Sequence, residues 1–221
     1  MRVLVWLAHA DDETLGAGGT IPQLLAVGHQ LQLIVASQGV VDLREQAADN
    51  RGPLAQACAR LGIEHWTTLG LPDQRFEQHP IAEITQRVQA ELALAPDLII
   101  THSARDLNRD HRIVAEVARI LGRPRQQPVS ILACEIPCVS LWNGQPFAPN
   151  FFVPLTEEGL ATKIEAFGYY TAENRTFPDP YSAEGLRTLA RQRGMESGYP
   201  AAEAFEIVRW YPQHGWGKYK V

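Results

Sequence analysis

Apolar residues along most of the chain fall into two kinds of pattern, which predict alternating strands and helices. Short continuous apolar runs such as 2–7 and 98–101 are typical of strands that are buried on both faces. Longer segments such as 81–95 place apolar residues on one side at helical spacing, which indicates amphipathic helices. The predicted strands are 2–7, 31–36, 65–69, 98–101, 129–135 and 204–210, and the predicted helices are 14–27, 50–61, 81–95, 113–121, 156–170 and 183–193. This alternation predicts an α/β fold with a mainly parallel sheet and helices on both faces.

The pattern loosens from Pro137 onward, where further prolines divide the chain into shorter pieces. The sequence contains no internal repeat, low-complexity tract or linker that would separate two domains. We therefore expect a single domain over residues 1–221, with an elaborated C-terminal third.

Composition narrows the class of protein. Of the 221 residues, 45% are hydrophobic and 20% charged, which excludes a disordered chain. No apolar stretch approaches the roughly 20 residues that a membrane span needs. With 20 Lys and Arg against 25 Asp and Glu the net charge is −5, which argues against a nucleic-acid partner. The first residues do not resemble an export signal and the three cysteines form no disulfide framework, so we expect a cytoplasmic protein.

A first polar cluster directly follows the opening predicted strand and contains His9, Asp11 and Asp12. In open α/β sheets, ligands bind at the carboxyl ends of the strands. Neighbouring buried carboxylates repel each other and lose hydration, and a divalent cation would offset that cost. The alternative is that the two aspartates cap the next helix and that His9 is a packed core side chain.

A second polar cluster, residues 102–111, also leaves a predicted strand and opens a predicted helix. Parallel strands end at the same edge of a sheet, so the two clusters face each other if their strands are neighbours. His9, Asp12 and His111 would then supply three ligands and leave a position for water, as in catalytic zinc sites, although another divalent transition metal stays compatible. The alternative for the second cluster is a solvated loop followed by a helix.

Two further ligand patterns fit less well. The glycines after the first strand fail the dinucleotide-binding fingerprint at Ile21, where that motif needs a third glycine. The alternating acidic residues of the second cluster fail the calcium-loop pattern at Arg112, which stands in the position of its glycine.

The two clusters together resemble the PIG-L/LmbE-like family of zinc-dependent N-acetylglucosaminyl de-N-acetylases. The resemblance rests on Ala8-His9-Ala10-Asp11-Asp12-Glu13 and on His102 followed by Asp106-Leu107-Asn108-Arg109-Asp110-His111. Ala10 replaces the proline of the family motif. Weaker landmarks such as Leu71-Pro72-Asp73 and Ala202-Glu203-Ala204-Phe205 extend the resemblance over most of the chain. It implies a Rossmann-like three-layer fold.

The resemblance also implies roles for the residues of the first motif and the end of the second. His9, Asp12 and His111 are implied as the ligands of Zn²⁺, and Asp11 as the general base. Asp110 is implied beside the metal, where it would orient a ligand or take part in proton transfer.

Four other candidates follow from the resemblance. Asn108 stands where other members have a histidine that assists the oxyanion, and His102 is the alternative source of an imidazole. Arg51 and Asp73 fall where substrate-binding residues are expected.

The expected function is hydrolysis of an N-acetyl group from an amino sugar or its conjugate, with release of acetate. Two alternatives stay open, a metal-dependent amidase that acts on a thiol-sugar conjugate or another non-acetyl amide, and a non-catalytic metal- or sugar-binding module. The expected partner is a small N-acetylated sugar, with no nucleic acid and no membrane span. A homo-oligomer is left open by the C-terminal segment 214–219, for which simple disorder is the alternative.

Overall fold

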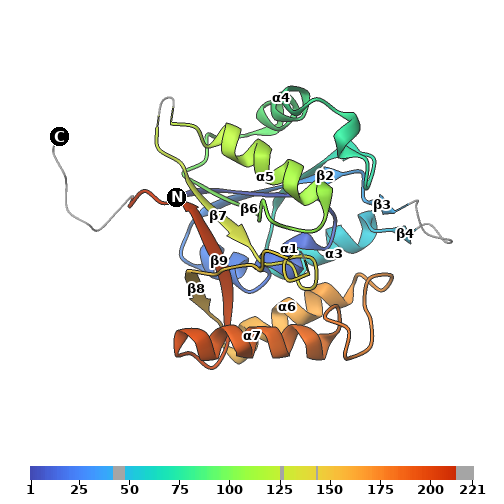
Figure 1. Ribbon diagram of the computed structural model, residues 1–221, viewed down its shortest axis with the longest axis vertical. Coiled ribbons are helices and arrows are strands. Elements are labelled where there is room, and N and C mark those ends of the chain that lie inside the picture. The colour runs from blue at the N-terminus through green and yellow to red at the C-terminus, as the bar shows by residue number, and fades with distance from the viewer. Residues whose placement is uncertain (42–47, 125–126, 143, 213–221) are drawn as a thin grey trace.

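The computed structural model describes residues 1–41, 48–124, 127–142 and 144–212, and its centre is a seven-stranded sheet (Figure 1). The strands lie in the order β5-β2-β1-β6-β7-β9-β8. Their bounds are β1 Arg2–Leu7, β2 Gln30–Ser37, β5 His65–Leu71, β6 Leu98–His102, β7 Ser130–Cys134, β8 Phe151–Pro154 and β9 Ala202–Arg209. The first five strands in this order are parallel, whereas β9 pairs antiparallel with both β7 and β8. The prediction of a mainly parallel sheet is confirmed.

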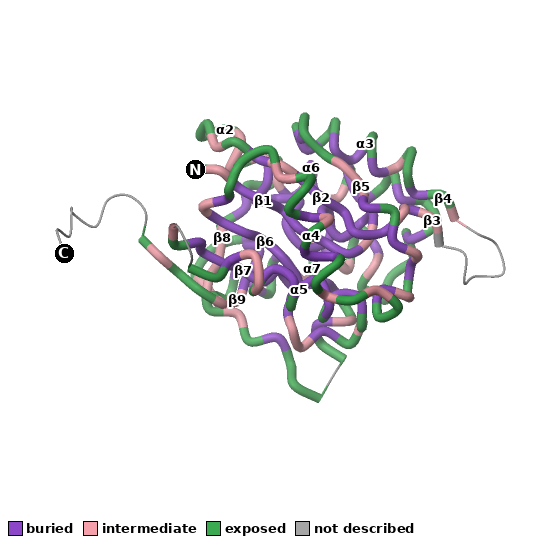
Figure 2. The backbone as a smooth tube through the Cα atoms, turned by 90° about the horizontal axis from the view of Figure 1, so that it is seen from above, coloured by how far each residue is buried: buried purple, intermediate pink, exposed green. Residues whose placement is uncertain are grey.

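Helices cover both faces of this sheet, as predicted (Figure 1). They are α1 Asp12–Ala17, α2 Thr20–Ala26, α3 Arg51–Leu61, α4 Ile81–Glu91, α5 Arg109–Leu121, α6 Glu157–Gly168 and α7 Ala183–Ser197. Val3, Val5 and Leu7 of β1 pack in the core beneath α1, α3, α6 and α7, whereas Leu4 and Trp6 pack beneath α4 and α5. Because both faces of β1 are covered, its sequence is a continuous apolar run. Figure 2 shows the central strands buried and the exposed positions on the surrounding helices.

The predicted helix 14–27 is divided into α1 and α2. The division lies at Gly18 and Gly19, where the Glu203 carboxylate accepts the backbone N–H groups of Gly19 and Thr20. A carboxylate at that position satisfies the free donors of a helix N-terminus, so a second helix begins there. Sequence periodicity could not show this division because Glu203 comes from the last strand.

Three other helices differ by four residues at one boundary. The helix α7 ends at Ser197 instead of residue 193, where Gly198 in the left-handed conformation caps it. The helix α4 ends at Glu91 instead of residue 95, because the Gln32 side chain donates to the carbonyl of Glu91 and accepts from the N–H of Ala93. The helix α5 begins at Arg109 instead of residue 113, because the Asn108 side chain accepts a backbone N–H in the first turn.

The chain also forms short elements that the sequence did not predict. They are the edge strand β8, the two-residue antiparallel pair β3 Val40–Val41 and β4 Ala48–Asp49, and the 3-10 turn η1 Phe76–Gln78. Each is too short to carry a periodic pattern. The segment 214–219, considered above as a contact for a second copy, lies outside the described residues.

The sheet order brings the two polar clusters together. The strands β1 and β6 are neighbours, with Val3 opposite Leu98. The strands that follow β1 in the chain, β2 and β5, lie on one side of it, and the strand that follows β6 lies on the other. Ligands in open α/β sheets bind at such a point, outside the carboxyl ends of the strands. No helix among the described residues is long and apolar enough to cross a membrane.

Candidate metal centre

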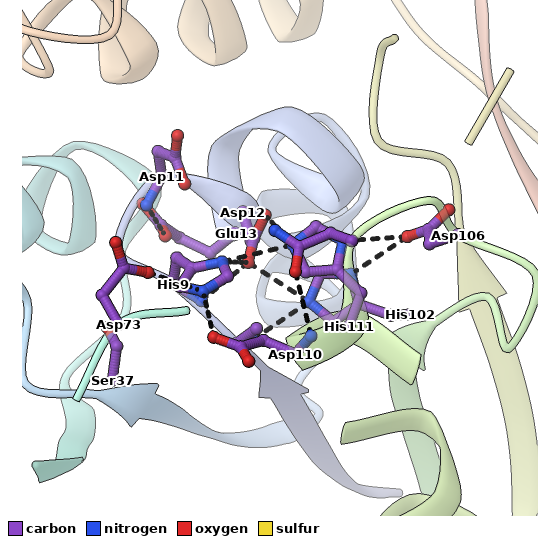
Figure 3. Close-up of polar contacts among 12 residues, drawn as sticks. His9, Asp11, Asp12, Glu13, Ser37, Asp73, His102, Asp106, Asp110 and His111 are labelled. Atoms are coloured by element: carbon purple, nitrogen blue, oxygen red, sulfur yellow. Dashed lines mark hydrogen bonds and ion pairs between the residues drawn. The ribbon is translucent and has the colours of Figure 1, made fainter. Parts of the chain in front are cut away.

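Three ligand atoms from the two clusters converge at the carboxyl ends of β1 and β6 (Figure 3). His9 Nδ1 lies 3.2 Å from His111 Nε2 and 3.6 Å from Asp12 Oδ2, and His111 Nε2 lies 3.6 Å from Asp12 Oδ1. A tetrahedral zinc ion with bonds of 2.0–2.1 Å separates its ligand atoms by about 3.4 Å. The spacing of these three side chains therefore fits a metal ion of that size with one coordination position left open.

The outer nitrogen of each imidazole is held by a carboxylate. His111 Nδ1 lies 2.9 Å from Asp106 Oδ2, and His9 Nε2 lies 2.9 Å from Asp73 Oδ1 and 3.1 Å from Asp110 Oδ2. A carboxylate keeps the proton on the nitrogen that faces it, so the inner nitrogen presents a lone pair. This arrangement is the usual support of metal-binding histidines, and it gives a second reason why the residues fit a metal.

Two of these three supporting carboxylates are themselves fixed by hydrogen bonds within the protein. Asp110 accepts the backbone N–H groups of Gln74 and Phe76, at 2.8 and 3.2 Å. Asp106 accepts the hydroxyl of Ser140 at 2.5 Å. Both aspartates are completely buried. Asp110 thus lies against His9, and its role stays a prediction. Asp106 was not singled out from the sequence, although it stands five residues before His111.

Asp12 is the anionic member of the ligand set. Burial alone would raise its pKa, but His111 and His102 outweigh burial and hold the pKa of Asp12 well below the usual range. The backbone N–H of His9 also donates to Asp12 Oδ2 at 2.7 Å. The carboxylate is thus ionised and its orientation is fixed before any cation arrives.

Asp11 has a strained backbone and a side chain that no helix cap uses. Its φ of 137° lies in the region that favours glycine, at a cost of about 1–3 kcal/mol. It occupies the N-cap position of α1 but makes no side-chain capping bond, which excludes the capping alternative for this residue. Asp11 lines the cavity together with the ligand set, and burial, with Asp12 and Glu173 nearby, raises the pKa of its carboxyl well above the usual value.

Glu13, the last residue of the first motif, has a structural role. Its carboxylate accepts the backbone N–H of Asp11 at 3.1 Å and the hydroxyl of Tyr170 at 2.6 Å. Burial raises the pKa of Glu13 to about 7, although the Tyr170 hydrogen bond opposes the shift. Glu13 holds the strained turn at Asp11 and does not line the cavity.

His102 lies behind the metal centre and outside the cavity lining. Its side chain has no exposed surface and its ring stacks on that of His111, with centroids 3.8 Å apart. Its Nε2 lies 3.0 Å from the backbone nitrogen of Ala8 and 3.2 Å from Asp12 Oδ2. The structure thus places His102 against two members of the ligand set.

Asn108 lines the cavity with a fixed orientation. Its Oδ1 accepts the backbone N–H of Asp110 at 2.9 Å as the cap of α5. Only the amide oxygen can accept that bond, so the NH₂ group is left for other partners.

The cavity measures about 250 Å³ and brings together residues that follow five neighbouring strands, β5, β2, β1, β6 and β7. Asp73 lines it, and its role in substrate binding stays a prediction. Arg51 does not: its side chain is 65% exposed, and its guanidinium pairs with Asp49. Asn50 and Glu173 also line the cavity and were missed, because no motif surrounds either residue. An ion, a water molecule and a small polar substrate could meet in this space, so hydrolysis is within its chemistry.

The fold and this side-chain group define a class, an α/β protein with a candidate metal-binding group at the carboxyl edge of a mainly parallel sheet. Residues 4–121 match the family model described as PIG-L, GlcNAc-PI de-N-acetylase, and the chain belongs to this family. The matched segment contains both motifs.

Part of the chain is also similar to a curated protein. Over 132 residues the chain is 28% identical to a 1D-myo-inositol 2-acetamido-2-deoxy-alpha-D-glucopyranoside deacetylase of Actinosynnema mirum, covering 46% of this chain and 47% of the relative. The chain thus aligns with about half the length of this curated relative.

Two solved structures share the fold. The N,N'-diacetylchitobiose deacetylase from Pyrococcus horikoshii is 19% identical, with a TM-score of 0.72 over 94% of this chain and 83% of that one. The 4-carboxy-2-hydroxymuconate hydratase from Pseudomonas putida KT2440 is 17% identical, with a TM-score of 0.74 over 98% and 99%. The predicted three-layer α/β fold is confirmed.

Proposed function

We propose that this protein is a zinc-dependent hydrolase that removes the N-acetyl group from an N-acetylated amino sugar or its conjugate and releases acetate. One observation carries the proposal. A three-atom ligand set and a carboxylate outside that set, Asp11, line the same cavity. Family membership and the relative from Actinosynnema mirum, described as a deacetylase of an acetamido sugar, support the reaction type.

In the proposed hydrolysis, each of the cavity residues has its own role. A zinc ion held by His9, Asp12 and His111 would supply Lewis-acid activation of a water molecule and of the acetyl carbonyl. Asp11 takes a proton from the attacking water as the water oxygen bonds to the acyl carbon. The C–N bond then breaks, and Asp11 returns the proton to the leaving amine, which gives acetate and a free amino sugar.

The other two candidates have supporting roles in this proposal. Asn108 directs its NH₂ group to the acyl oxygen, where negative charge develops, because its own oxygen is used by the helix cap. As a neutral amide it donates a hydrogen bond and transfers no proton. His102 is buried and stacks on His111, so it positions that ligand instead of meeting the substrate.

The test is acetate release from a panel of N-acetylated sugars by the purified protein. We expect activity that a chelator abolishes and that added Zn²⁺ restores, and no activity in a His111→Ala variant that retains its fold. Amides of thiol-sugar conjugates belong in the same panel, since faster turnover there would replace acetyl sugars as the substrate. Absence of acetate from every sugar by the zinc-loaded protein would contradict the proposal.

Hydration of a polycarboxylate is a second candidate, because the hydratase from Pseudomonas putida has the same fold. The cavity chemistry argues against it. Carboxylate substrates are held by Arg or Lys, and neither residue type occurs among the described side chains that line the cavity. The shared fold is compatible with both reactions, but the lack of a cationic side chain among the described lining residues favours the deacetylase.

A further inference from the structure

One wall of the cavity is built by residues that belong to neither motif. Ser37 ends β2, Gly39 lies two residues further on, and Asn50 directly precedes α3, and all three line the cavity. The Ser37 and Asn50 side chains are buried, with exposed fractions of 2% and 4% for the whole residues. The proposed hydrolysis assigns no role to any of the three.

Hydrogen bonds tie this wall together and fix it relative to the candidate metal centre. The Gly39 N–H donates to Ser37 Oγ at 3.2 Å, and the Asn50 N–H donates to the carbonyl of Gly39 at 2.7 Å. The Ser37 N–H donates at 2.9 Å to the carbonyl of Ala8, which immediately precedes the first candidate metal ligand. Gly39 has a φ of 76°, and a Cβ there would lie 3.0 Å from the Arg51 side chain, which favours glycine. The wall therefore keeps a fixed position beside the candidate ligands.

The wall presents one hydrogen-bond donor and one acceptor to the cavity. Ser37 Oγ accepts from Gly39, so its own hydrogen is left to donate, and it has no acceptor among the described residues. The Asn50 side chain donates from Nδ2 to Glu173 Oε1 at 3.3 Å. The Asn50 Oδ1 lies on the other side of the amide, and no described residue donates to it. Polar groups inside a cavity gain stability when a ligand pairs them.

These two groups differ in chemistry from the residue that the sequence predicted. Arg51 was expected to bind substrate, but its guanidinium pairs with Asp49 outside the cavity. Its neighbour Asn50, a neutral amide, lines the cavity instead. A hydroxyl donor and an amide oxygen match two hydroxyl groups, because each hydroxyl both donates and accepts. They match an ionised carboxylate or phosphate poorly, since such a group only accepts and cannot pair with the amide oxygen.

We propose that Ser37 and Asn50 are specificity-determining residues that bind two neighbouring hydroxyl groups of the sugar ring, with Ser37 donating to one and Asn50 Oδ1 accepting from the other. This inference rests on the proposed function, which directs the acetamido group to the metal. In a 2-acetamido sugar that group is on C2, and the rest of a conjugate is attached at C1. The neighbouring pair is therefore formed by the hydroxyls at C3 and C4, and the substrate class is an amino sugar in which both are unsubstituted.

The inference is tested by combining two variants with two altered substrates. The zinc-loaded full chain is assayed with N-acetylglucosamine and with its 3-deoxy and 4-deoxy analogues. A hydrogen bond between neutral groups corresponds to about a 2- to 10-fold change. We expect Ser37→Ala and Asn50→Ala each to lower kcat/KM for N-acetylglucosamine by that factor, mainly through KM. Each variant should lose nothing further on the one analogue that lacks its hydroxyl partner, and that analogue should differ between the two variants.

Two further variants control this experiment. Ser37→Thr keeps the hydroxyl and should retain the wild-type KM for N-acetylglucosamine. Ser130→Ala removes another buried serine hydroxyl, at the amino end of β7, where it bonds to the backbone of Tyr211. It should change kcat/KM for none of the three sugars. Circular dichroism checks the fold of each variant, and Ser37→Ala alone provides the test if Asn50→Ala does not fold.

Equilibrium binding of the same three sugars to the zinc-loaded protein separates this inference from the proposed function. If no sugar is hydrolysed but the binding constants follow the expected pattern, the reaction is wrong and the hydroxyl contacts are right. If acetate is released while Ser37→Ala and Asn50→Ala leave KM unchanged, the reaction is right and the inference is overturned. An equal loss on all three sugars also overturns it, because that result indicates a change in the shape of the cavity and not a lost contact. Absence of both binding and hydrolysis overturns both proposals.

Discussion

Among the described residues, most buried charged side chains form two clusters, one at the candidate metal centre and one between α6, α7 and β9. The two clusters differ in how their charges are matched. In the second, Lys163 Nζ lies 2.6 Å from Glu203 Oε1, and Arg193 Nε donates to Glu135 Oε2 at 2.8 Å. Each carboxylate there has a cationic side chain against it. At the metal centre, carboxylates outnumber the imidazoles.

This difference in charge balance indicates which cluster stabilises the fold and which one is suited to bind a ligand. A buried ion pair whose partners both come from the chain needs nothing from outside. A buried excess of carboxylates is costly until a cation binds, and proteins accept that cost at sites that act on ligands. The same residue types thus stabilise the fold in one cluster and prepare a binding site in the other.

The largest expected effect is that of Asp11→Asn on the reaction. Loss of the proposed general base should lower kcat by roughly 10²–10⁴-fold while the metal stays bound, since Asp11 is not in the ligand set. Metal content by elemental analysis and acetate release check this. The stability of the metal-free variant should not fall, because one of several repelling carboxylates is removed. Full activity in Asp11→Asn would show that the base is misassigned.

Breaking the buried ion pair between Lys163 and Glu203 should instead lower the stability of the fold and leave metal binding unchanged. Lys163→Met leaves Glu203 buried without its cation, which should destabilise the fold by about 3–5 kcal/mol. Urea unfolding measures this change. The metal content of the folded fraction should stay that of the wild type. Equal losses of stability from Lys163→Met and Asp11→Asn would remove the distinction between the two clusters.

A smaller effect is expected from Asp106→Asn, which keeps the size of the side chain but weakens its bond to His111. Changes in carboxylates that support a metal-binding histidine lower metal affinity about 10- to 100-fold. Competition with a chelator of known affinity measures the change. An affinity equal to that of the wild type would indicate that His111 is oriented by other contacts, such as its stacking on His102.

The smallest effect concerns an ion pair at the surface, between Arg2 and Asp97. Hydrogen bonds from Arg2 lower the pKa of Asp97, so the pair stabilises the fold above the unfolded pKa and this contribution is lost as pH falls through the lower folded value. Asp97→Asn should lower Tm by less than about 3 °C near neutral pH and by less still in acid. A larger loss would mean that exposed and buried pairs differ less than the comparison assumes.

The sequence predicted the parts of the molecule that depend on local pattern. Strands and helices with clear periodicity were predicted within a few residues, and each motif was placed at the end of a strand. That these two strands are neighbours is a finding of the structure. Arg51 and Asp73 show what such patterns cannot predict. Both were expected to bind substrate, but in the structure Asp73 lines the cavity, whereas Arg51 lies outside it and its guanidinium pairs with Asp49. Glu173 could not be predicted, since it meets Asn50 across 123 positions with no motif at either residue.

The hydrogen bonds of Lys163 and Glu203 limit how far the chain can be truncated before the candidate site loses its structure. Lys163 donates to the carbonyl of Leu15, in α1, and Glu203 holds the first residues of α2. The helix that starts at the first motif is therefore anchored from the last third of the chain. A truncated protein ending at residue 121 would retain every proposed ligand residue. It would lose the hydrogen bonds from Lys163 and Glu203 that hold α1 and the start of α2 in place.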